Sequence, residues 1–323
     1  MSDRAPVLSA VVVHWRNEEQ LARLRAAWPV DDPRFELVVV DNSSTLGGLE
    51  PPAILVDEGR NLGFGGGVAR GVQRARGAWI LVLNPDILPL PGALGGLLAA
   101  VEGATRDGDD SNSGIGTAGI VPALEHPDGR PQHRWQLQPL PTAATLLLQT
   151  FFLAGSRGPI SPPPEGTAIQ QPAAAALALD RRVLEEVGGF DPSFFPAWFE
   201  DVDLARRLHR GGHRLEYRPS IRFQHDMGGS VPALGYGPFL WVYYRNLCRY
   251  LRKHHGPAAA LAARGLLPLG MLLRLLLLPV RTPKRATGRL DAARGLLAVA
   301  AGALTGWRHP RPLVRRFSPE ARP

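Results

Sequence analysis

Short runs of β-branched and other apolar residues alternate with amphipathic stretches along the first quarter of the chain. Helix-like patterns occupy two of the gaps, at Glu18–Ala27 and Gly66–Arg76. Parallel strands need a long crossover, which is most often a helix, so this alternation predicts βαβ units around a mostly parallel sheet. The four strand candidates are Leu8–Val13, Glu36–Val40, Ala53–Val56 and Trp79–Leu83.

The same α/β pattern continues with interruptions to about residue 217. A chain of 323 residues is long enough for one large or two modest domains, each with a buried core. The later strand candidates are Thr117–Val121, Ala173–Leu179 and Arg214–Tyr217. The later helix candidates are Gly92–Glu102, Arg181–Val187 and Val202–Arg210.

The net charge of +8 is unevenly distributed. The stretch from Arg245 onward holds 16 of the 37 Lys and Arg residues but only 2 of the 29 Asp and Glu residues. The basic character therefore belongs to the C-terminal tail. Cys248 is the only cysteine, which excludes an internal disulfide and gives no indication of an oxidising compartment. The first residues lack a charged start before a long apolar region, so we expect no signal peptide.

Three carboxylates lie within four positions at Glu200, Asp201 and Asp203, directly before a helix-like pattern. Acidic groups are favoured at a helix start, so one or two of them fit the role of caps. Four aromatic residues precede them, and an aromatic-walled carboxylate cluster also fits a sugar site with a general base. The residues alone leave both interpretations open. The aromatic residues are Phe194, Phe195, Trp198 and Phe199.

This cluster and six other segments, taken in order, resemble the family 2 glycosyltransferases, and most of all their rhamnosyltransferase-like branch. No single segment is specific, but the ordered set is, and it covers roughly residues 7 to 255. The resemblance implies a GT-A fold, with a Rossmann-like, mostly parallel sheet flanked by helices. The segments are Val7–Trp15, Leu37–Ser44, Asn61–Gly71, Trp79–Ile87, Gly188–Leu208, Ile221–Ser230 and Tyr243–Asn246.

The resemblance also implies roles at the donor end. Asp41 would accept from the nucleotide base, although an Asx-turn or helix cap explains an aspartate at a strand end equally well. Asn61 and Gly63 open a glycine-rich turn that would approach the diphosphate. Asn84 and Asp86 stand where GT-A enzymes carry their Asp-x-Asp signature, and only Asp86 keeps the carboxylate.

The resemblance pairs Asp86 with His225 as the two protein ligands of a divalent cation. One carboxylate and one imidazole suit Mn²⁺ or Mg²⁺, and the imidazole favours Mn²⁺. A bound cation would neutralise charge on the leaving diphosphate. The alternative for His225 is a plain strand end.

The Glu-Asp motif of the family aligns with Glu200 and Asp201, which makes Asp201 the expected base. Inverting transfer needs one base on the acceptor hydroxyl, so one carboxylate is enough. Glu200 would orient the acceptor, or serve as the base if the register is shifted by one. Trp198 offers an apolar face for stacking an acceptor sugar, and Asp203 would cap or brace the helix.

The tail begins with a basic helix pattern from Tyr243 and continues as a Leu-rich segment, Ala258–Val280. We expect a catalytic domain over residues 1–255 and a basic, apolar helical extension over residues 256–323. Arg264 and Arg274 interrupt the segment, which argues against a transmembrane span. An interfacial helix pair on anionic lipid fits both leucines and arginines. Burial against the catalytic domain or a second subunit is the alternative, and no motif indicates nucleic-acid binding.

These observations predict an inverting, metal-dependent glycosyltransferase at the inner face of the plasma membrane. It would move a sugar, with dTDP-rhamnose as the best candidate donor, to a glycan or lipid-linked acceptor of a cell-surface polysaccharide. A UDP-hexose or UDP-galactofuranose donor is the first alternative. The second is a sugar-nucleotide-binding protein without turnover. Only Ala69 and Asp180 favour it, because both depart from the family pattern.

Overall fold

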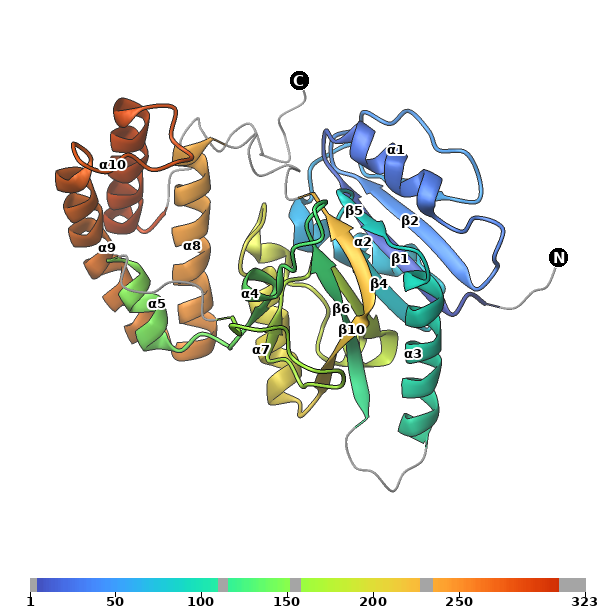
Figure 1. Ribbon diagram of the computed structural model, residues 1–323. Coiled ribbons are helices and arrows are strands. Elements are labelled where there is room, and N and C mark those ends of the chain that lie inside the picture. Colours follow the sequence, from blue (N-terminus) through green and yellow to red (C-terminus); the bar gives the residue numbers. More distant parts are fainter. Residues whose placement is uncertain (1–4, 110–115, 152–157, 227–234, 308–323) are drawn as a thin grey trace. The chain divides into compact units, whose positions relative to one another are not determined.

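The computed structural model describes residues 5–109, 116–151, 158–226 and 235–307. They form two compact units, shown in Figure 1. The first unit contains Met1–Leu140, Ser156–Ser193 and Glu200–Gly229, and the second contains Pro141–Gly155, Phe194–Phe199 and Ser230–Pro323. The expected domain boundary at residue 255 stays a prediction, and the compact units divide the chain at other positions.

The first unit is built on an eight-stranded sheet with the order β3-β2-β1-β4-β9-β6-β10-β5. β3, β2, β1 and β4 are parallel neighbours, whereas β9 runs antiparallel to both β4 and β6. The mostly parallel α/β sheet is thereby confirmed. The strands are β1 (Leu8–His14), β2 (Phe35–Asp41), β3 (Ile54–Asp57), β4 (Trp79–Leu83), β5 (Ile87–Pro89), β6 (Thr117–Glu125), β9 (Ala176–Asp180) and β10 (Arg214–His225).

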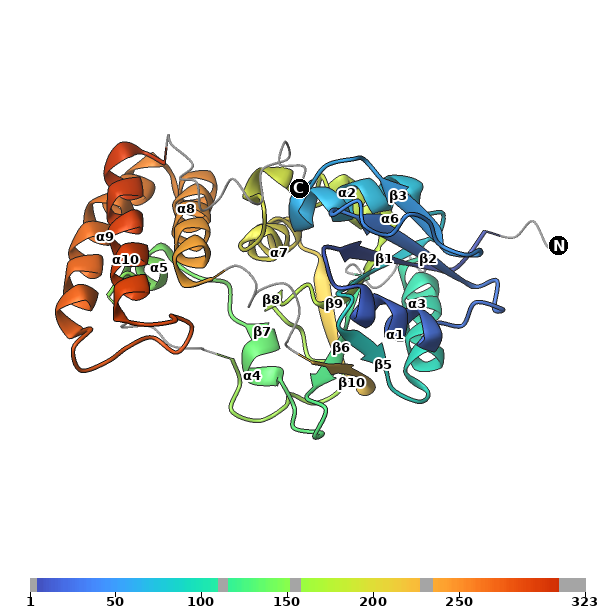
Figure 2. The ribbon, with the colours of Figure 1, turned by 90° about the horizontal axis from the view of Figure 1, so that it is seen from above.

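Helices cover both faces of this sheet, as Figure 2 shows. Leucines of α1 (Glu18–Ala27) and α3 (Ala93–Asp109) pack on one face, while α2 (Gly63–Arg74), α6 (Arg181–Glu186) and α7 (Glu200–Arg210) pack on the other. Alternate residues of the buried strands supply the two cores, because successive strand side chains point to opposite faces. A small second sheet pairs β7 (Leu137–Gln138) with β8 (Gln171–Pro172), next to α4 (His133–Gln136).

The expected elements of the first unit are present, with two differences. α3 continues to Asp109, whereas the sequence pattern predicts a helix that ends at Glu102. β10 is one strand of 12 residues, whereas the sequence patterns predict a strand that ends at Tyr217 and a separate later run. A register shift between Arg218 and Arg222 carries the strand past Pro219, a residue that cannot donate to the ladder.

The second unit is helical. Its elements are α5 (Ala143–Gln149), α8 (Tyr236–His255), α9 (Pro257–Leu277) and α10 (Arg289–Thr305). Of these, α9 and α10 confirm the expected C-terminal helical extension. Gly270 of α9 lies so close to the backbone of Thr150 that a Cβ there would be 2.2 Å from the Thr150 carbonyl oxygen. Among the described helices, α9 alone is long and apolar enough to cross a membrane, and a third of its most apolar window is buried. The glycine-rich stretch Gly228–Gly237, whose composition is typical of a lid, lies mostly outside the described residues.

Candidate active site

Asp86 and His225 come together because of strand pairing. Asp86 lies in the turn between β4 and β5, and the antiparallel register of β5 and β10 places His225 opposite Ile87. Oδ1 of Asp86 is consequently 3.7 Å from Nε2 of His225. Both side chains are buried, with exposed fractions of 7% and 3%. Burial lowers the pKa of His225, although the Asp86 charge opposes this, so a neutral imidazole is favoured.

Gln132 and Trp135 enclose the imidazole of His225, and sequence reasoning did not identify either. Oε1 of Gln132 is 2.8 Å from Nδ1 of His225, and its Nε2 donates to the His225 carbonyl over 2.9 Å. The Trp135 ring lies against the imidazole with ring centroids 5.4 Å apart. No motif marks the segment His126–Gln136, because its contacts depend on the distant strand β10.

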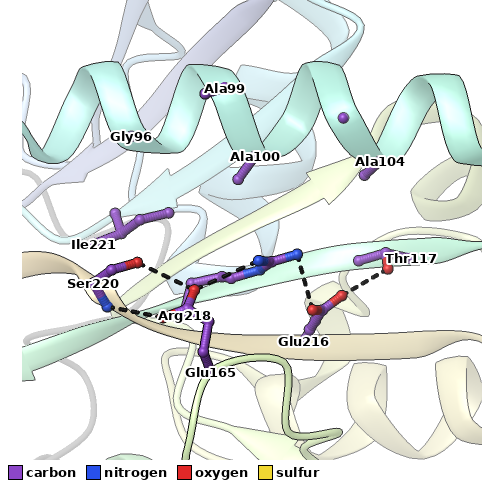
Figure 3. Close-up of a pocket in the computed structure, with 11 residues that line it drawn as sticks. Gly96, Ala99, Ala100, Ala104, Thr117, Glu165, Glu216, Arg218, Ser220 and Ile221 are labelled. Atoms are coloured by element: carbon purple, nitrogen blue, oxygen red, sulfur yellow. Dashed lines mark hydrogen bonds and ion pairs between the residues drawn. The ribbon is translucent and has the colours of Figure 1, made fainter.

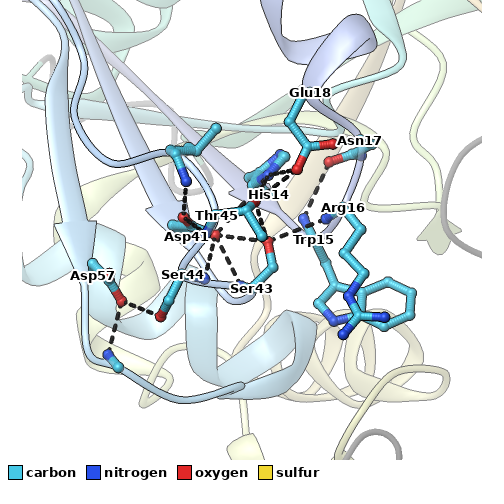
Figure 4. A network of polar contacts seen from close by, with 12 residues as sticks. His14, Trp15, Arg16, Asn17, Glu18, Asp41, Ser43, Ser44, Thr45 and Asp57 are labelled. Atoms are coloured by element: carbon cyan, nitrogen blue, oxygen red, sulfur yellow. Dashed lines mark hydrogen bonds and ion pairs between the residues drawn. The ribbon is translucent and has the colours of Figure 1, made fainter. Parts of the chain in front are cut away.

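The carboxylate of Asp41 organises the loop after β2, as Figure 4 shows. Its two oxygens accept hydrogen bonds from the backbone of Ser43, Ser44, Thr45 and Leu46, over 2.8–3.0 Å, and from the Ser43 hydroxyl. Burial raises the pKa of Asp41, but the donors outweigh it and hold the pKa below its usual value. The geometry favours the turn interpretation. Contact between this carboxylate and a nucleotide base stays a prediction.

His14 of β1 lies beside this loop because the parallel register pairs it with Asp41. Its Nε2 is 3.3 Å from the Thr45 hydroxyl and 3.6 Å from Glu18, while its buried Nδ1 has no hydrogen-bond partner among the described residues. Thr45 also donates to Glu18 over 2.6 Å. These contacts tie the ends of β1 and β2 together at the carboxyl edge of the sheet, where ligands of open α/β sheets bind.

Asn61 and Gly63 form the entrance to α2. Asn61 accepts from the Gly63 amide over 2.8 Å, and Gly63 has a φ of +72°, which favours glycine. Gly67, one turn further, presses against Val13, where a Cβ would meet a side-chain carbon at 2.8 Å. The glycines therefore bring α2 close to β1. Whether Asn61 and Gly63 also contact a donor stays a prediction.

Glu200 and Asp201 begin α7 in a region of low polarity. Burial is the main cause that raises the pKa of both carboxyls, and the Asp201 charge adds to it for Glu200. Oε2 of Glu200 is buried without a partner among the described residues. Asp201 accepts from the Val202 amide over 2.8 Å and from the backbone of Ala174.

Asn84 is bound next to Ala174: its backbone amide donates to the Ala175 carbonyl over 2.8 Å. The predicted base Asp201 and the predicted donor-site segment that contains Asn84 and Asp86 thus attach to adjacent residues of one backbone segment. Sequence reasoning on its own places these groups more than a hundred positions apart. The antiparallel insertion of β9 between β4 and β6 unites them.

Asp203 stabilises α7 through an ion pair with Arg207. Asp203 is fully buried and accepts from Nε and Nη2 of Arg207 over 2.9 and 2.7 Å. The same guanidinium donates to the carbonyls of Val187 and Gly189. One side chain therefore fixes the Gly-Gly turn against the helix, and Asp203 has a structural role as expected.

The aromatic residues before Glu200 serve a different purpose from the expected sugar-binding wall. Phe194 and Phe199 are buried, and Phe199 packs on Tyr243 and Tyr250 of α8 within the second unit. Trp198 contacts Phe239 edge-on with ring centroids 4.9 Å apart. The rings of Phe194 and Phe199 thus contribute to a core, because the backbone conformation of the loop turns both side chains inward. An acceptor contact by Trp198 stays a prediction.

Asn246 and Arg245 of α8 hold that aromatic loop. Nδ2 of Asn246, a fully buried residue, is within 2.8–3.1 Å of the carbonyls of Phe194, Ala197 and Trp198. Arg245 donates to the carbonyl of Phe195, and burial lowers its pKa to about 10. The Tyr-Tyr-Arg-Asn segment is therefore a clamp for the chain that leads into Glu200.

A pocket with a volume of about 420 Å³ lies between α3 and β10, as Figure 3 shows. Its floor carries Arg218, which forms ion pairs with Glu216 over 2.9 Å and with Glu165 over 3.5 Å. It opens beside the first half of β10, whereas His225 ends that strand. Because two carboxylates share one guanidinium, the lining carries an excess of negative charge, and the pocket does not match the expected diphosphate site.

Comparisons with known proteins show which proteins this chain is similar to. Two proteins of Mycobacterium tuberculosis, from strains CDC 1551 / Oshkosh and ATCC 25618 / H37Rv, are 27% identical to this chain over 252 residues. Each is named N-acetylglucosaminyl-diphospho-decaprenol L-rhamnosyltransferase, and the similarity covers 70% of this chain and 78% of the relative.

Among solved structures, a mannosyltransferase from Pyrobaculum calidifontis in complex with GDP-Man and Mn²⁺ is 16% identical, with a TM-score of 0.49 over 94% of this chain and 88% of that one. S. aureus TarS 1-349 is 14% identical, with a TM-score of 0.48 over 93% of this chain and 91% of that one. Both are too dissimilar to indicate a substrate. Residues 11–113 match the model of Glycosyl transferase family 2. Residues 11–113 are thus similar to a family 2 glycosyltransferase domain, and most of the chain is similar to rhamnosyltransferases.

Proposed function

We propose that this protein transfers a rhamnosyl residue from dTDP-rhamnose to a sugar carried on a polyprenyl diphosphate, with inversion at the anomeric carbon. The observation that carries the proposal is the similarity to N-acetylglucosaminyl-diphospho-decaprenol L-rhamnosyltransferase over 70% of the chain. The local arrangement supports it, since the half-buried Asp201 and the Asn84–Asp86 segment attach to the adjacent residues Ala174 and Ala175.

Asp201 is the proposed base. Burial raises the pKa of Asp201, and a more basic carboxylate is a better acceptor for the proton of a sugar hydroxyl. The acceptor oxygen forms a bond to the anomeric carbon, the bond from that carbon to the diphosphate breaks, and the proton goes to Asp201. Burial, and then the charge of Asp201, raise the pKa of Glu200 well above its ordinary value, so this carboxyl is the proposed group that orients the acceptor.

Asp86 and His225 fit a divalent cation. The 3.7 Å between Oδ1 of Asp86 and Nε2 of His225 is less than twice a metal–ligand bond of roughly 2.0–2.2 Å, so one ion can contact both. No cluster of three or more His, Cys, Asp or Glu side chains that could hold a metal occurs among the described residues. Donor oxygens and water would complete the coordination. When bound, Mn²⁺ or Mg²⁺ would stabilise the negative charge of the departing nucleotide diphosphate.

A donor panel tests this function. The purified full-length chain is incubated with dTDP-rhamnose, UDP-glucose or UDP-galactofuranose, a synthetic N-acetylglucosaminyl polyprenyl diphosphate, and Mn²⁺ or chelator. We expect a rhamnosylated product that depends on metal and on dTDP-rhamnose. Turnover with a UDP-sugar alone would identify that sugar nucleotide as the donor in place of dTDP-rhamnose. No turnover with any donor would favour a binding protein without catalysis.

The surface of α9 supports a peripheral membrane location. Its two arginines turn into the second unit, where Arg264 donates to the Ala303 carbonyl over 2.8 Å and Arg274 to the Gln149 carbonyl over 3.0 Å. The outward face is left apolar. Its most exposed leucines are Leu261, Leu269, Leu272 and Leu276, with exposed fractions of 54–70%.

α10 carries a second stripe of exposed leucines. Leu290, Leu297 and Leu304 are 54–70% exposed and recur every seven residues, which places them on one side of the helix. The connection between α9 and α10 is basic and exposed, with Arg281 and Lys284 among its residues. Apolar side chains beside cations match an anionic bilayer surface, so we propose that these helices lie on the inner face of the plasma membrane, next to a lipid-linked acceptor.

A further inference from the structure

The side chain of Gln132 joins two strands at the metal-binding end of the sheet. Its backbone amide donates to the carbonyl of Leu124 in β6 over 2.8 Å, and β6 runs parallel to β10 with Glu125 opposite Gln224. A side chain that extends from this point reaches the end of β10. Gln132 is 4% exposed, so water does not compete for its amide.

The partners of this amide determine its orientation. One of its two terminal atoms lies 2.9 Å from the carbonyl oxygen of His225, which can only accept a hydrogen bond, so that atom is Nε2. The other atom, 2.8 Å from Nδ1 of His225, is therefore Oε1. The reverse orientation would place two oxygens against each other. Oε1 can only accept, and hence Nδ1 of His225 carries the proton.

The same amide acts on a second histidine. Nε2 of Gln132 lies 3.2 Å from Nδ1 of His126, which must then be the unprotonated nitrogen of that ring. One glutamine thus imposes opposite tautomers on the two imidazoles. In His225 the unprotonated nitrogen is Nε2, which is the atom that faces Asp86 at 3.7 Å.

We propose that Gln132 is a positioning residue that locks His225 in the tautomer and orientation able to bind a metal ion together with Asp86. The inference rests on the proposed metal-dependent transfer. Trp135 supports the same orientation from the face of the ring. Residues that hold a ligating histidine through its other nitrogen contribute about 10- to 100-fold to metal affinity. We expect Gln132→Leu to weaken Mn²⁺ binding by a factor within that range.

The first experiment reads the tautomers directly. Long-range ¹H–¹⁵N spectra of the metal-free, full-length chain, with labelled histidine, should show a protonated Nδ1 and a bare Nε2 for His225, and the reverse for His126. The His225→Ala and His126→Ala variants assign the signals. A His225 ring protonated at Nε2 would overturn the inference, whatever the activity of the protein.

The second experiment separates positioning from stability. Gln136 is a fully buried glutamine at the end of α4, the short helix that Gln132 precedes. Its side-chain amide forms hydrogen bonds with the backbone of Leu124 and Pro122 and not with His225. Gln136→Leu should lower the unfolding free energy while its dissociation constant for Mn²⁺ alone, measured from the electron paramagnetic resonance of free Mn²⁺, stays within about twofold of the parent value. Equal losses of Mn²⁺ affinity in Gln132→Leu and Gln136→Leu would overturn the positioning role.

A conservative variant keeps the test valid if Gln132→Leu does not fold. Gln132→Glu retains an oxygen that accepts from Nδ1 of His225, so it should bind Mn²⁺ within about tenfold of the parent. Loss of binding in this variant with a retained fold would count against the inference. The two proposals fail separately: a parent with the expected His225 tautomer that takes up no Mn²⁺ overturns the metal-dependent function, whereas Mn²⁺ uptake with the reversed tautomer overturns the role of Gln132.

Discussion

Nδ2 of Asn246 lies 3.1 Å from the carbonyl oxygen of Trp198. This contact stabilises a backbone that is unusual for large residues, since Trp198 has a φ of +71° and Phe199 a φ of +74°. Such conformations cost on the order of 1–3 kcal/mol each and persist only when their surroundings enforce them. Asn246 is part of that enforcement. The chain continues from the strained pair directly into Glu200 and Asp201.

Asn246→Ala should therefore impair both stability and transfer. It leaves three carbonyls without their donor, and each buried acceptor that stays unpaired costs about 1–3 kcal/mol. Urea unfolding and a rhamnosyl transfer assay measure the two effects. Arg249→Ala, at an exposed position of the same helix, should change the unfolding free energy by no more than about 0.5 kcal/mol. Asn246→Ala with parental stability would mean that the loop is held by other contacts.

Asp201→Asn should abolish transfer and leave nucleotide binding almost unchanged, because the base acts on the acceptor. Loss of a general base costs roughly 10²- to 10⁴-fold in rate. Initial transfer rates and calorimetry of dTDP binding give the two readouts. If the variant keeps activity within about tenfold of the parent, Glu200 becomes the better candidate for the base.

Glu200 predicts a dependence of stability on pH. The pKa of this carboxyl is raised in the folded chain, first by burial and then by the charge of Asp201. The folded state thus keeps the proton to higher pH than the unfolded state, and the associated stability is lost as pH rises above the ordinary glutamic acid pKa toward the raised value. Glu200→Gln stays neutral, so its stability relative to the parent should increase as pH rises above the ordinary glutamic acid pKa toward the raised value.

Urea unfolding of both proteins at several pH values across this window tests the direction. Glu50→Gln, a substitution at an exposed position, is the matched control and should track the parent throughout. A difference between Glu200→Gln and the parent that shrinks with rising pH would contradict the burial of a protonated carboxyl.

Asp86→Ala and His225→Ala should each weaken Mn²⁺-dependent binding of dTDP and raise the metal concentration needed for transfer. The reason is that each removes one of only two protein ligands. Calorimetry of dTDP binding with Mn²⁺ and with chelator provides the measurement. Equal nucleotide affinity under both conditions in the parent would show that charged side chains, and not a cation, stabilise the diphosphate.

Leu276→Glu and Leu297→Glu should reduce binding of the full-length chain to vesicles that contain phosphatidylglycerol. Both replace an exposed leucine on the proposed membrane surface with a group that anionic lipid repels. Val30→Glu alters a similarly exposed apolar residue of the first unit and should bind like the parent. Binding of the parent should also decline with salt, because the basic residues are screened. Dimerisation of the parent without vesicle binding would identify a second copy as the partner of this surface.

The sequence predicts much of the first unit because its signals are local. β4 occupies Trp79–Leu83 and α1 occupies Glu18–Ala27, as the β-branched and amphipathic patterns indicate. The places of Asp41, Asp86 and His225 at strand ends follow from the same patterns. For Asp86 and His225, the segments that flank them also resemble those of the family.

The contacts of Gln132 could not be predicted in this way. Its partner His225 is 93 positions away, and their meeting depends on the register between β6 and β10. The aromatic loop is a second example. Phe199 reads as a sugar-binding residue in the sequence, but the positive φ of this residue and its neighbour directs the ring into a core. Neither the register nor the conformation has a local signature.

The chain crosses between its two compact units five times, and a stretch of only six residues, Phe194–Phe199, belongs to the second unit while both of its flanks belong to the first. The helical unit is therefore not a detachable appendage. A chimera that takes this unit from a related transferase would have to exchange three separate segments together. A single fusion point after α7 would combine α8 of the relative with the Phe194–Phe199 loop of this chain. Mutations in α8 and in the loop should accordingly compensate one another across relatives.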